Sequence, residues 1–167
     1  MINIVLFEPE IPQNTGNVMR TCMAANLKLH LIEPFGFSLT EKALRRSAMD
    51  YIKELEYQVY SDYQDFLKKN PNQGNHYYIT RYSKQVYSDV VFPIPVYLIF
   101  GNESHGLPRD LLHNNLNHSL RIPMVKNARS LNLANSVALV SYEVLRQHDF
   151  LSLTTYESIK GEDFIYK

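Results

Sequence analysis

The chain is 167 residues long and carries 17 lysines and arginines against 17 aspartates and glutamates, so its net charge is zero. This length suits one domain with a sizeable core, and zero net charge excludes a global positive field, which leaves any contact with nucleic acid to local clusters. The single cysteine, Cys22, excludes an internal disulfide and fits a reducing compartment.

No segment has the pattern of a membrane span or a signal peptide. The apolar residues 2–7 are not preceded by a basic segment and are followed directly by Glu8, which does not fit a signal peptide. No apolar run approaches the roughly 20 residues that a membrane span needs. We therefore expect a soluble, cytoplasmic protein with a single domain over residues 1–167 and no membrane partner.

Short apolar runs alternate with amphipathic ones along the chain. In chain order, we predict a strand over 2–7, a loop at 12–16 that opens a helix with Val18, Cys22 and Ala25 inward, a strand over 28–33, a helix near 40–52, a strand near 56–60 and a helix near 62–69. Strands near 76–81 and 95–100, a short helix near 108–115, a strand near 118–123 and a long helix over about 131–147 complete the pattern, and 149–167 form a docked or loose tail. This alternation predicts an α/β fold with a mostly parallel sheet and helices on both faces.

Two serines stand at the spacing of a capping box, the side-chain pair that begins many helices. Ser38 precedes Glu41 by three residues, and Ser61 precedes Gln64 by three. We therefore expect these serines to cap the second and third helices.

Familiar catalytic motifs are excluded by their spacing. Gly101 and Gly106 have the spacing of a phosphate-binding loop, but Leu107 and Pro108 stand where that loop needs lysine and serine or threonine. No dinucleotide fingerprint follows the first strand. The six histidines form no metal-ligand pair, and adjacent Ser104–His105 does not suit a serine nucleophile with its base, so we expect neither a metal site nor hydrolase chemistry.

Two segments near the carboxyl end place polar and glycine residues directly after apolar runs. They are residues 98–108, LIFGNESHGLP, and residues 120–135, LRIPMVKNARSLNLAN. Open α/β proteins build ligand sites where strands end, so a nucleotide-binding site is expected here and not at the amino end.

Three ordered segments resemble the motifs of the SpoU branch of the SPOUT RNA methyltransferases. They are EPEIPQNTGNVMR at 8–20, LIFGNESHGLP at 98–108 and RIPMVKNARSLNLAN at 121–135. The resemblance extends from Met1 to about His148 and is closest to the small TrmL or YibK type, which modifies tRNA at the wobble nucleotide.

The resemblance implies a deep trefoil knot in the carboxyl part of the chain, over about 76–148, which is an exception to the usual unknotted connections. It also implies a homodimer with the active site near the subunit interface. The cofactor that the resemblance implies is S-adenosylmethionine, held by three loops that correspond to 79–81, to the loop beginning at Gly101 and to 122–131. The implied reaction is methylation of the ribose 2′-hydroxyl of nucleotide 34, a cytidine or modified uridine in the anticodon loop of leucine tRNAs.

Cofactor residues are expected in those three loops. Apolar side chains beside backbone groups suit adenine and a methionine chain, although ordinary core packing is the alternative for each. Gly101 lets the backbone approach a ligand closely, or it is an ordinary turn glycine. Ser130 touches the cofactor or caps the long helix. The expected cofactor-binding residues are Ile79, Thr80, Gly101, Ile122, Met124, Ser130 and Leu131.

Three polar residues are the expected catalytic set. Arg20 matches a family arginine that activates the ribose hydroxyl or holds its phosphate; because arginine is effectively always protonated, stabilising the developing alkoxide is easier for it than acting as a base. Glu103 orients Arg20 or the substrate, or is a surface carboxylate. Asn135 lies with Asn132 on the opening turn of the last helix, where side chains face a ligand or bond the backbone.

Because the net charge is zero, RNA must be bound by local patches of basic residues. A homodimer would carry each patch twice. Bases of a single-stranded anticodon loop can be splayed out and read by such a surface. A charged helix face is often only exposed to solvent and binds nothing, which is the alternative for the arginines. For Tyr142, burial in a dimer interface is the favoured role. The expected substrate-contacting residues are Asn14, Asn17, Arg45, Arg46, Arg129 and Tyr142. For Asn14 and Asn17, fixing or capping the loop that carries Arg20 is an equally good alternative.

Two positions depart from the family pattern. His105 stands where relatives carry arginine, and Asn102 where they carry proline. A histidine is only partly charged near neutrality, which weakens a phosphate contact. The alternative function is therefore an RNA-binding or assembly factor with little or no catalysis; a small nucleotide-binding hydrolase lacks any motif. Convergence of Arg20, Glu103 and Asn135 on one pocket would favour the enzyme.

Overall fold

The computed structural model describes residues 1–40, 42, 44, 46, 55–151 and 153–166. Six strands form one parallel sheet in the order β3-β2-β1-β5-β4-β6. Their bounds are β1 (Ile2–Phe7), β2 (Lys28–Ile32), β3 (Tyr57–Tyr60), β4 (His76–Ile79), β5 (Val96–Phe100) and β6 (Ser119–Leu120). The predicted parallel α/β sheet is confirmed.

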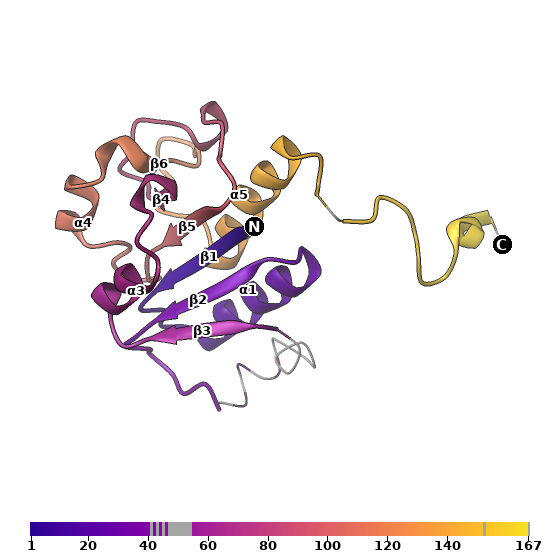
Figure 1. Cartoon of the computed structure of the whole chain (residues 1–167), viewed down its shortest axis with the longest axis horizontal. Coiled ribbons are helices and arrows are strands. Elements are labelled where there is room, and N and C mark those ends of the chain that lie inside the picture. The colour runs from indigo at the N-terminus through magenta and orange to yellow at the C-terminus, as the bar shows by residue number, and fades with distance from the viewer. Residues whose placement is uncertain (41, 43, 45, 47–54, 152, 167) are drawn as a thin grey trace.

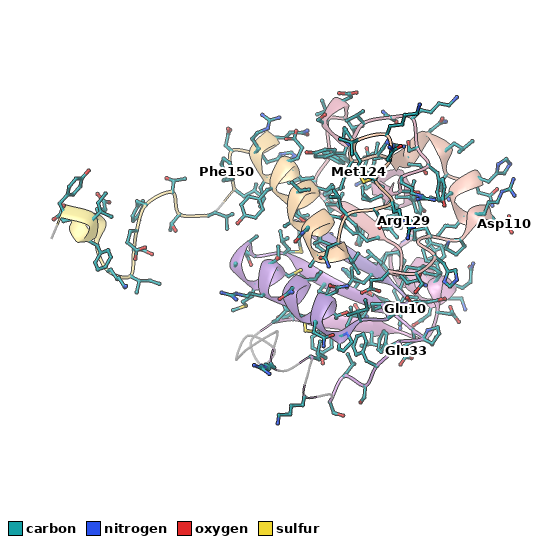
Figure 2. All side chains as sticks on the ribbon, turned by 180° about the vertical axis from the view of Figure 1, so that it is seen from behind. Glu10, Glu33, Asp110, Met124, Arg129 and Phe150 are labelled. Atoms are coloured by element: carbon teal, nitrogen blue, oxygen red, sulfur yellow. The ribbon has the colours of Figure 1, made fainter. Side chains whose placement is uncertain are left out.

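Helices cover both faces of the sheet (Figure 1). The α-helices whose bounds lie within the described residues are α1 (Pro12–Ala24), α3 (Tyr63–Lys69), α4 (Arg109–His113) and α5 (Leu133–Gln147). Short 3₁₀ turns are η2 (Gln73–Asn75), η3 (Tyr87–Asp89), η4 (Leu116–His118) and η5 (Glu162–Tyr166). Figure 2, which views the sheet from behind, shows α1 and α5 side by side on one face, and α3 and α4 pack on the other.

The central strand β1 explains why one sheet can hold two cores. All six of its residues are buried, as expected of a parallel strand covered on both faces. Ile4 and Leu6 pack toward α1 and α5, where Val18, Cys22 and Val140 lie, whereas Val5 and Phe7 belong to the core under α3 and α4. The expected inward residues Val18, Cys22 and Ala25 are all buried.

Several predicted boundaries are wrong. α1 begins at Pro12, where a loop was expected, because proline is well suited to the first helical position. α3 is capped by Asp62, whose carboxylate accepts from the Asp65 amide at 2.8 Å, and not by Ser61. The strand expected over 118–123 ends at Leu120, because Arg121 instead pairs with residues 85–87. The predicted helix at 40–52, with its Ser38–Glu41 box, lies largely outside the described residues.

The carboxyl tail leaves the body of the molecule (Figure 1). Leu153 still packs against the main core, but Tyr156, Ile159 and Phe164 are exposed. Of the two expectations for the tail, the structure favours the loose one beyond Leu153. No described helix is long and apolar enough to cross a membrane.

A buried polar cluster lies under α3, among aromatic rings. The His30 ring nitrogens lie 2.7 Å from the Tyr60 hydroxyl and 3.1 Å from the Asn3 amide oxygen. His76 is fully buried against Tyr97 and Phe66, and neither of its ring nitrogens has a hydrogen-bond partner among the described residues. Burial lowers the pKa of both histidines from 6.5 to about 4.

This cluster predicts a loss of stability in mild acid. The folded pKa values lie below the unfolded value of 6.5, so the stabilisation is complete above pH 6.5 and is lost as pH falls toward 4. A shift of this size corresponds to about 3 kcal/mol for each histidine between pH 7 and pH 4. Urea unfolding across this range should show the decline, and His76→Phe should remove about half of the histidine contribution. If the free energy of unfolding of His76→Phe falls with pH as steeply as that of the wild type, His76 is not a source of the acid sensitivity.

Candidate functional site

A cavity of about 880 Å³ lies at the carboxyl ends of β4 and β5, beside the loop that follows β6. Its walls come from segments that are far apart in the sequence: the start of α1, the loops after β4 and β5, the loop 122–132 and the start of α5. This is the edge of a parallel sheet at which ligands usually bind. The site expected from the two carboxyl-terminal segments is therefore a real cavity in the fold.

All seven expected cofactor residues line this cavity. They are Ile79, Thr80, Gly101, Ile122, Met124, Ser130 and Leu131. The apolar members are not simply core residues, since Ile79, Ile122 and Met124 are only partly buried and Leu131 is exposed. Three loops thus form one wall of mixed apolar and polar character, suited to a nucleoside.

The loop after β5 is held in shape by Asn102. Its side-chain oxygen accepts from the amides of His105 at 2.8 Å and Gly106 at 3.1 Å. Gly101 packs so closely against this turn that a Cβ atom there would lie 2.1 Å from the Gly106 carbonyl carbon. Asn102, one of the two departures from the family pattern, therefore stabilises the turn that faces the cavity, and His105 lines the cavity from the same turn.

Glu103 joins this loop to the first helix. Its carboxylate accepts from the amides of Glu10 at 2.9 Å and Ile11 at 3.3 Å and from the Asn14 side chain at 2.8 Å. A carboxylate near the first turn of a helix also interacts favourably with its free amides. Glu103 lines the cavity, but its oxygens are directed to these donors and not to Arg20. Its geometry fits positioning of the loop better than contact with a reacting atom.

Asn14 extends the same connection to the last helix. It is buried, and its side-chain oxygen accepts a hydrogen bond from the side-chain amide of Asn132 at 2.9 Å. Asn132 in turn caps α5, since its oxygen accepts from the Asn135 backbone amide at 3.3 Å. The alternative in which Ser130 caps this helix is wrong. Asn14 lines the cavity, and its two side-chain hydrogen bonds join the loops beside it, which agrees with the alternative in which it fixes a loop.

The other expected polar residues lie outside the cavity of their own chain. Asn17 and Arg20 are exposed on the outward side of α1, and Asn135 and Tyr142 are exposed on the outward side of α5. These two helices are in contact on one face of the sheet (Figure 2). Within one chain, Arg20, Glu103 and Asn135 therefore do not converge on the cavity, because only Glu103 lines it.

The expected basic residues divide between the cavity and the distant surface. Arg129 is exposed and lines the cavity, on the same loop as Met124 (Figure 2). Arg46 is exposed elsewhere, and Arg45 lies outside the described residues. In the described part of the chain, no cluster of three or more histidine, cysteine or acidic side chains is placed to hold a metal ion.

Sequence reasoning missed several cavity residues. Ile11, Phe100, Leu133 and Ser136 complete the walls, and Tyr82 stands at the end of the loop after β4. Tyr82 directly follows the first expected cofactor loop, 79–81, so a search one residue beyond that loop would have found it. Ile11, Leu133 and Ser136 come from helix starts, and Phe100 is the last residue of β5; whether these side chains face the cavity depends on tertiary packing.

The fold and this cavity define a parallel α/β protein whose ligand site is built by loops from three distant segments. The sequence pattern of the SpoU rRNA Methylase family matches residues 1–142. This match spans most of the chain, and the chain belongs to the SpoU methylase family.

Relatives with high coverage support the same grouping. The chain is 46% identical over 156 residues to a protein of Geobacillus stearothermophilus, covering 92% of this chain and 99% of that one. It is 42% identical over 152 residues to "tRNA (cytidine(34)-2′-O)-methyltransferase" of Photorhabdus asymbiotica, covering 88% and 94%. A solved structure described as "Structural insights into the 2-OH methylation of C/U34 on tRNA" superposes with a TM-score of 0.84 at 38% identity, covering 89% and 97%.

The close packing at Gly101 predicts that even alanine is not tolerated there. A methyl group at this position meets backbone atoms of Gly106 and Leu107, so the turn must shift. We expect Gly101→Ala to lower the free energy of unfolding by about 1–3 kcal/mol, as overpacking does, and to weaken binding of S-adenosylhomocysteine in calorimetric titration. Gly74→Ala is the matched control, because its nearest contact is an ordinary 3.6 Å. Equal behaviour of the two variants would contradict this view of the turn.

Proposed function

We propose that this chain is an S-adenosylmethionine-dependent tRNA methyltransferase that methylates the ribose 2′-hydroxyl of the wobble nucleotide, position 34. The observation that carries the proposal is the cavity itself, because all seven residues assigned to the cofactor from separate segments line it. The names of relatives supply the substrate class, a tRNA with cytidine or uridine at position 34. A modified uridine and leucine tRNAs are the finer expectation that the family resemblance implies.

The cavity fits the proposed cofactor in size and chemistry. Its volume of about 880 Å³ lies within the range of small-molecule sites. Ile79, Ile122 and Leu131 offer apolar walls for adenine and the methionine chain, while Gly101 lets the backbone approach a ligand. S-adenosylmethionine supplies an electrophilic methyl group on a sulfonium; the protein must align the acceptor oxygen with it.

Alignment and charge stabilisation account for the proposed catalysis. Fixing two reactants in the right geometry can supply roughly 7–11 kcal/mol. Arg20 then stabilises the negative charge that develops on the ribose oxygen, because a guanidinium remains protonated and is a poor base. Glu103 keeps the loops in register through Asn14, so we assign it positioning and not proton transfer.

A homodimer reconciles Arg20 with this role. The outward side of α5 exposes Leu139 and Tyr142, each 45% accessible, next to the side of α1 that carries Asn17 and Arg20. Apolar side chains on such a face favour association with a second copy. We propose that the dimer buries this face and completes the active site with Arg20 and Asn135. The knot over about 76–148 stays a prediction; the pairing of Arg121 with residues 85–87 is compatible with it.

The second candidate is an RNA-binding or assembly factor with little catalysis. It is favoured by the position of Arg20 and Asn135 outside the cavity and by His105 within it. This candidate predicts RNA binding without methyl transfer, which the following experiment separates.

The decisive experiment is incubation with methyl-labelled S-adenosylmethionine and total tRNA, followed by mapping of the labelled nucleotide. Label on the ribose of nucleotide 34 supports the proposal. Label on a base would refute the reaction type, and tRNA binding without label would favour the second candidate.

The role of Arg20 predicts a selective loss of turnover. Arg20→Ala should lower the rate of methyl transfer by at least about 100-fold, the usual effect of removing one charge-stabilising donor. S-adenosylhomocysteine should bind normally, because Arg20 does not line the cavity of its own chain. Arg109→Ala, at the exposed start of α4, is the control and should keep full activity. Unchanged turnover in Arg20→Ala would rule out this role.

The dimer predicts a mass of twice the 19.5 kDa of one chain in light scattering. Leu139→Asp should give a monomer, because it places an unpaired charge in the proposed interface. Leu116→Asp, at a 64% exposed position on η4, should remain dimeric. A wild-type monomer at working concentration would overturn the proposed interface.

A further inference from the structure

Tyr82 is an exposed aromatic residue at the mouth of the cavity. It lies three residues after the end of β4, lines the cavity, and leaves 69% of its surface accessible. Four other tyrosines of this sheet region, Tyr60, Tyr63, Tyr78 and Tyr97, are buried or partly buried in the core under α3 and α4. An accessible ring at the edge of a ligand site therefore needs an explanation other than core packing.

The ring of Tyr82 is held in place. The Arg81 guanidinium lies 4.9 Å from the ring centroid and donates to the Tyr82 hydroxyl at 3.1 Å. The same guanidinium donates to the Arg129 carbonyl at 2.9 Å, and the Tyr82 amide donates to the Thr80 hydroxyl at 3.3 Å. These contacts fix the ring against the loop 122–132 without covering it.

A ring fixed by a cation and open to solvent is suited to stacking. Flat π-systems bind nucleobases by stacking, and single-stranded RNA is commonly held on exposed aromatic side chains beside basic residues. Among the described residues, neither Arg81 nor Arg129 has a carboxylate within ion-pair distance. Their charges are thus available to the phosphates of a strand whose base lies on Tyr82.

We propose that Tyr82 is a stacking platform for a base of the RNA substrate, next to the ribose that receives the methyl group, with Arg81 and Arg129 facing its backbone. This inference deepens the proposed function and rests on it. The adenine of the cofactor is the other base that could stack there. The RNA base is favoured because the ring is mostly accessible at the mouth, whereas Ile79, Phe100 and Ile122 offer more enclosed apolar surface within the cavity.

The test uses the full-length protein and an anticodon stem-loop RNA that carries 2-aminopurine beside the wobble nucleotide. Stacking on an aromatic ring quenches this fluorescent base, so the readout requires no turnover. We expect quenching with the wild type and with Tyr82→Phe, which keeps the ring, and none with Tyr82→Leu. Tyr82→Ala should weaken RNA binding about 10- to 100-fold, the range of one base–aromatic stack. Binding of S-adenosylhomocysteine should not change in any variant.

Tyr156→Ala is the matched control, because Tyr156 is 61% exposed on the tail and does not line the cavity. It should leave quenching and RNA affinity unchanged. Equal quenching by Tyr82→Leu and the wild type overturns the proposal, as does a loss of S-adenosylhomocysteine binding in Tyr82→Ala. A defect in Tyr82→Phe as large as in Tyr82→Ala also overturns it, because the hydroxyl would then be the important group. If the wild type quenches but transfers no methyl group, the proposed function fails while the stacking platform stands.

Discussion

The carboxylate of Glu103 is the connection on which the site depends. It accepts three hydrogen bonds, two from the segment that leads into α1 and one from Asn14 in the first turn of that helix, and through Asn14 it reaches Asn132 at the start of α5. Residues about 90 and 118 positions apart are thereby joined beside one cavity. Hydrogen bonds to a charged acceptor are stronger than neutral ones, and each donor left alone in such a partly buried place would be costly. The cavity loops are thus joined by a polar chain in addition to the apolar packing of residues such as Leu107 and Leu133.

The same arrangement separates two kinds of residue in the site. The walls of the cavity belong to one chain and are held by Asn102, Glu103 and Asn132. The outward sides of α1 and α5, with Arg20 and Tyr142, belong to a surface that this chain leaves open. The cavity walls and this open helix surface are therefore different parts of the fold.

The sequence predicted the sheet well because parallel strands buried on both faces are short continuous apolar runs, as in β1 and β5. It was less accurate at helix ends: Asp62 and Asn132 act as caps where Ser61 and Ser130 were candidates. Neighbouring polar residues compete for one cap, and the backbone angles that decide between them come from packing. The expected cofactor residues were predictable because their segments resemble the motifs of a known family; of the seven, only Thr80 and Gly101 directly follow a strand. The position of Arg20 outside the cavity was not, since it depends on how α1 packs on the sheet. Tyr82 was missed because an aromatic residue after a strand is usually part of the core.

The strand order also has a consequence for synthesis on the ribosome. β1 lies between β2 and β5, so one of its neighbours is made early and the other only when residues 96–100 have left the exit tunnel. Until then a strand with every residue apolar or destined for burial has an unpaired edge, which is a known route to misassociation. The vulnerable period of this protein is therefore set by the length of chain between its first and fifth strands, and slow translation across that stretch would prolong it.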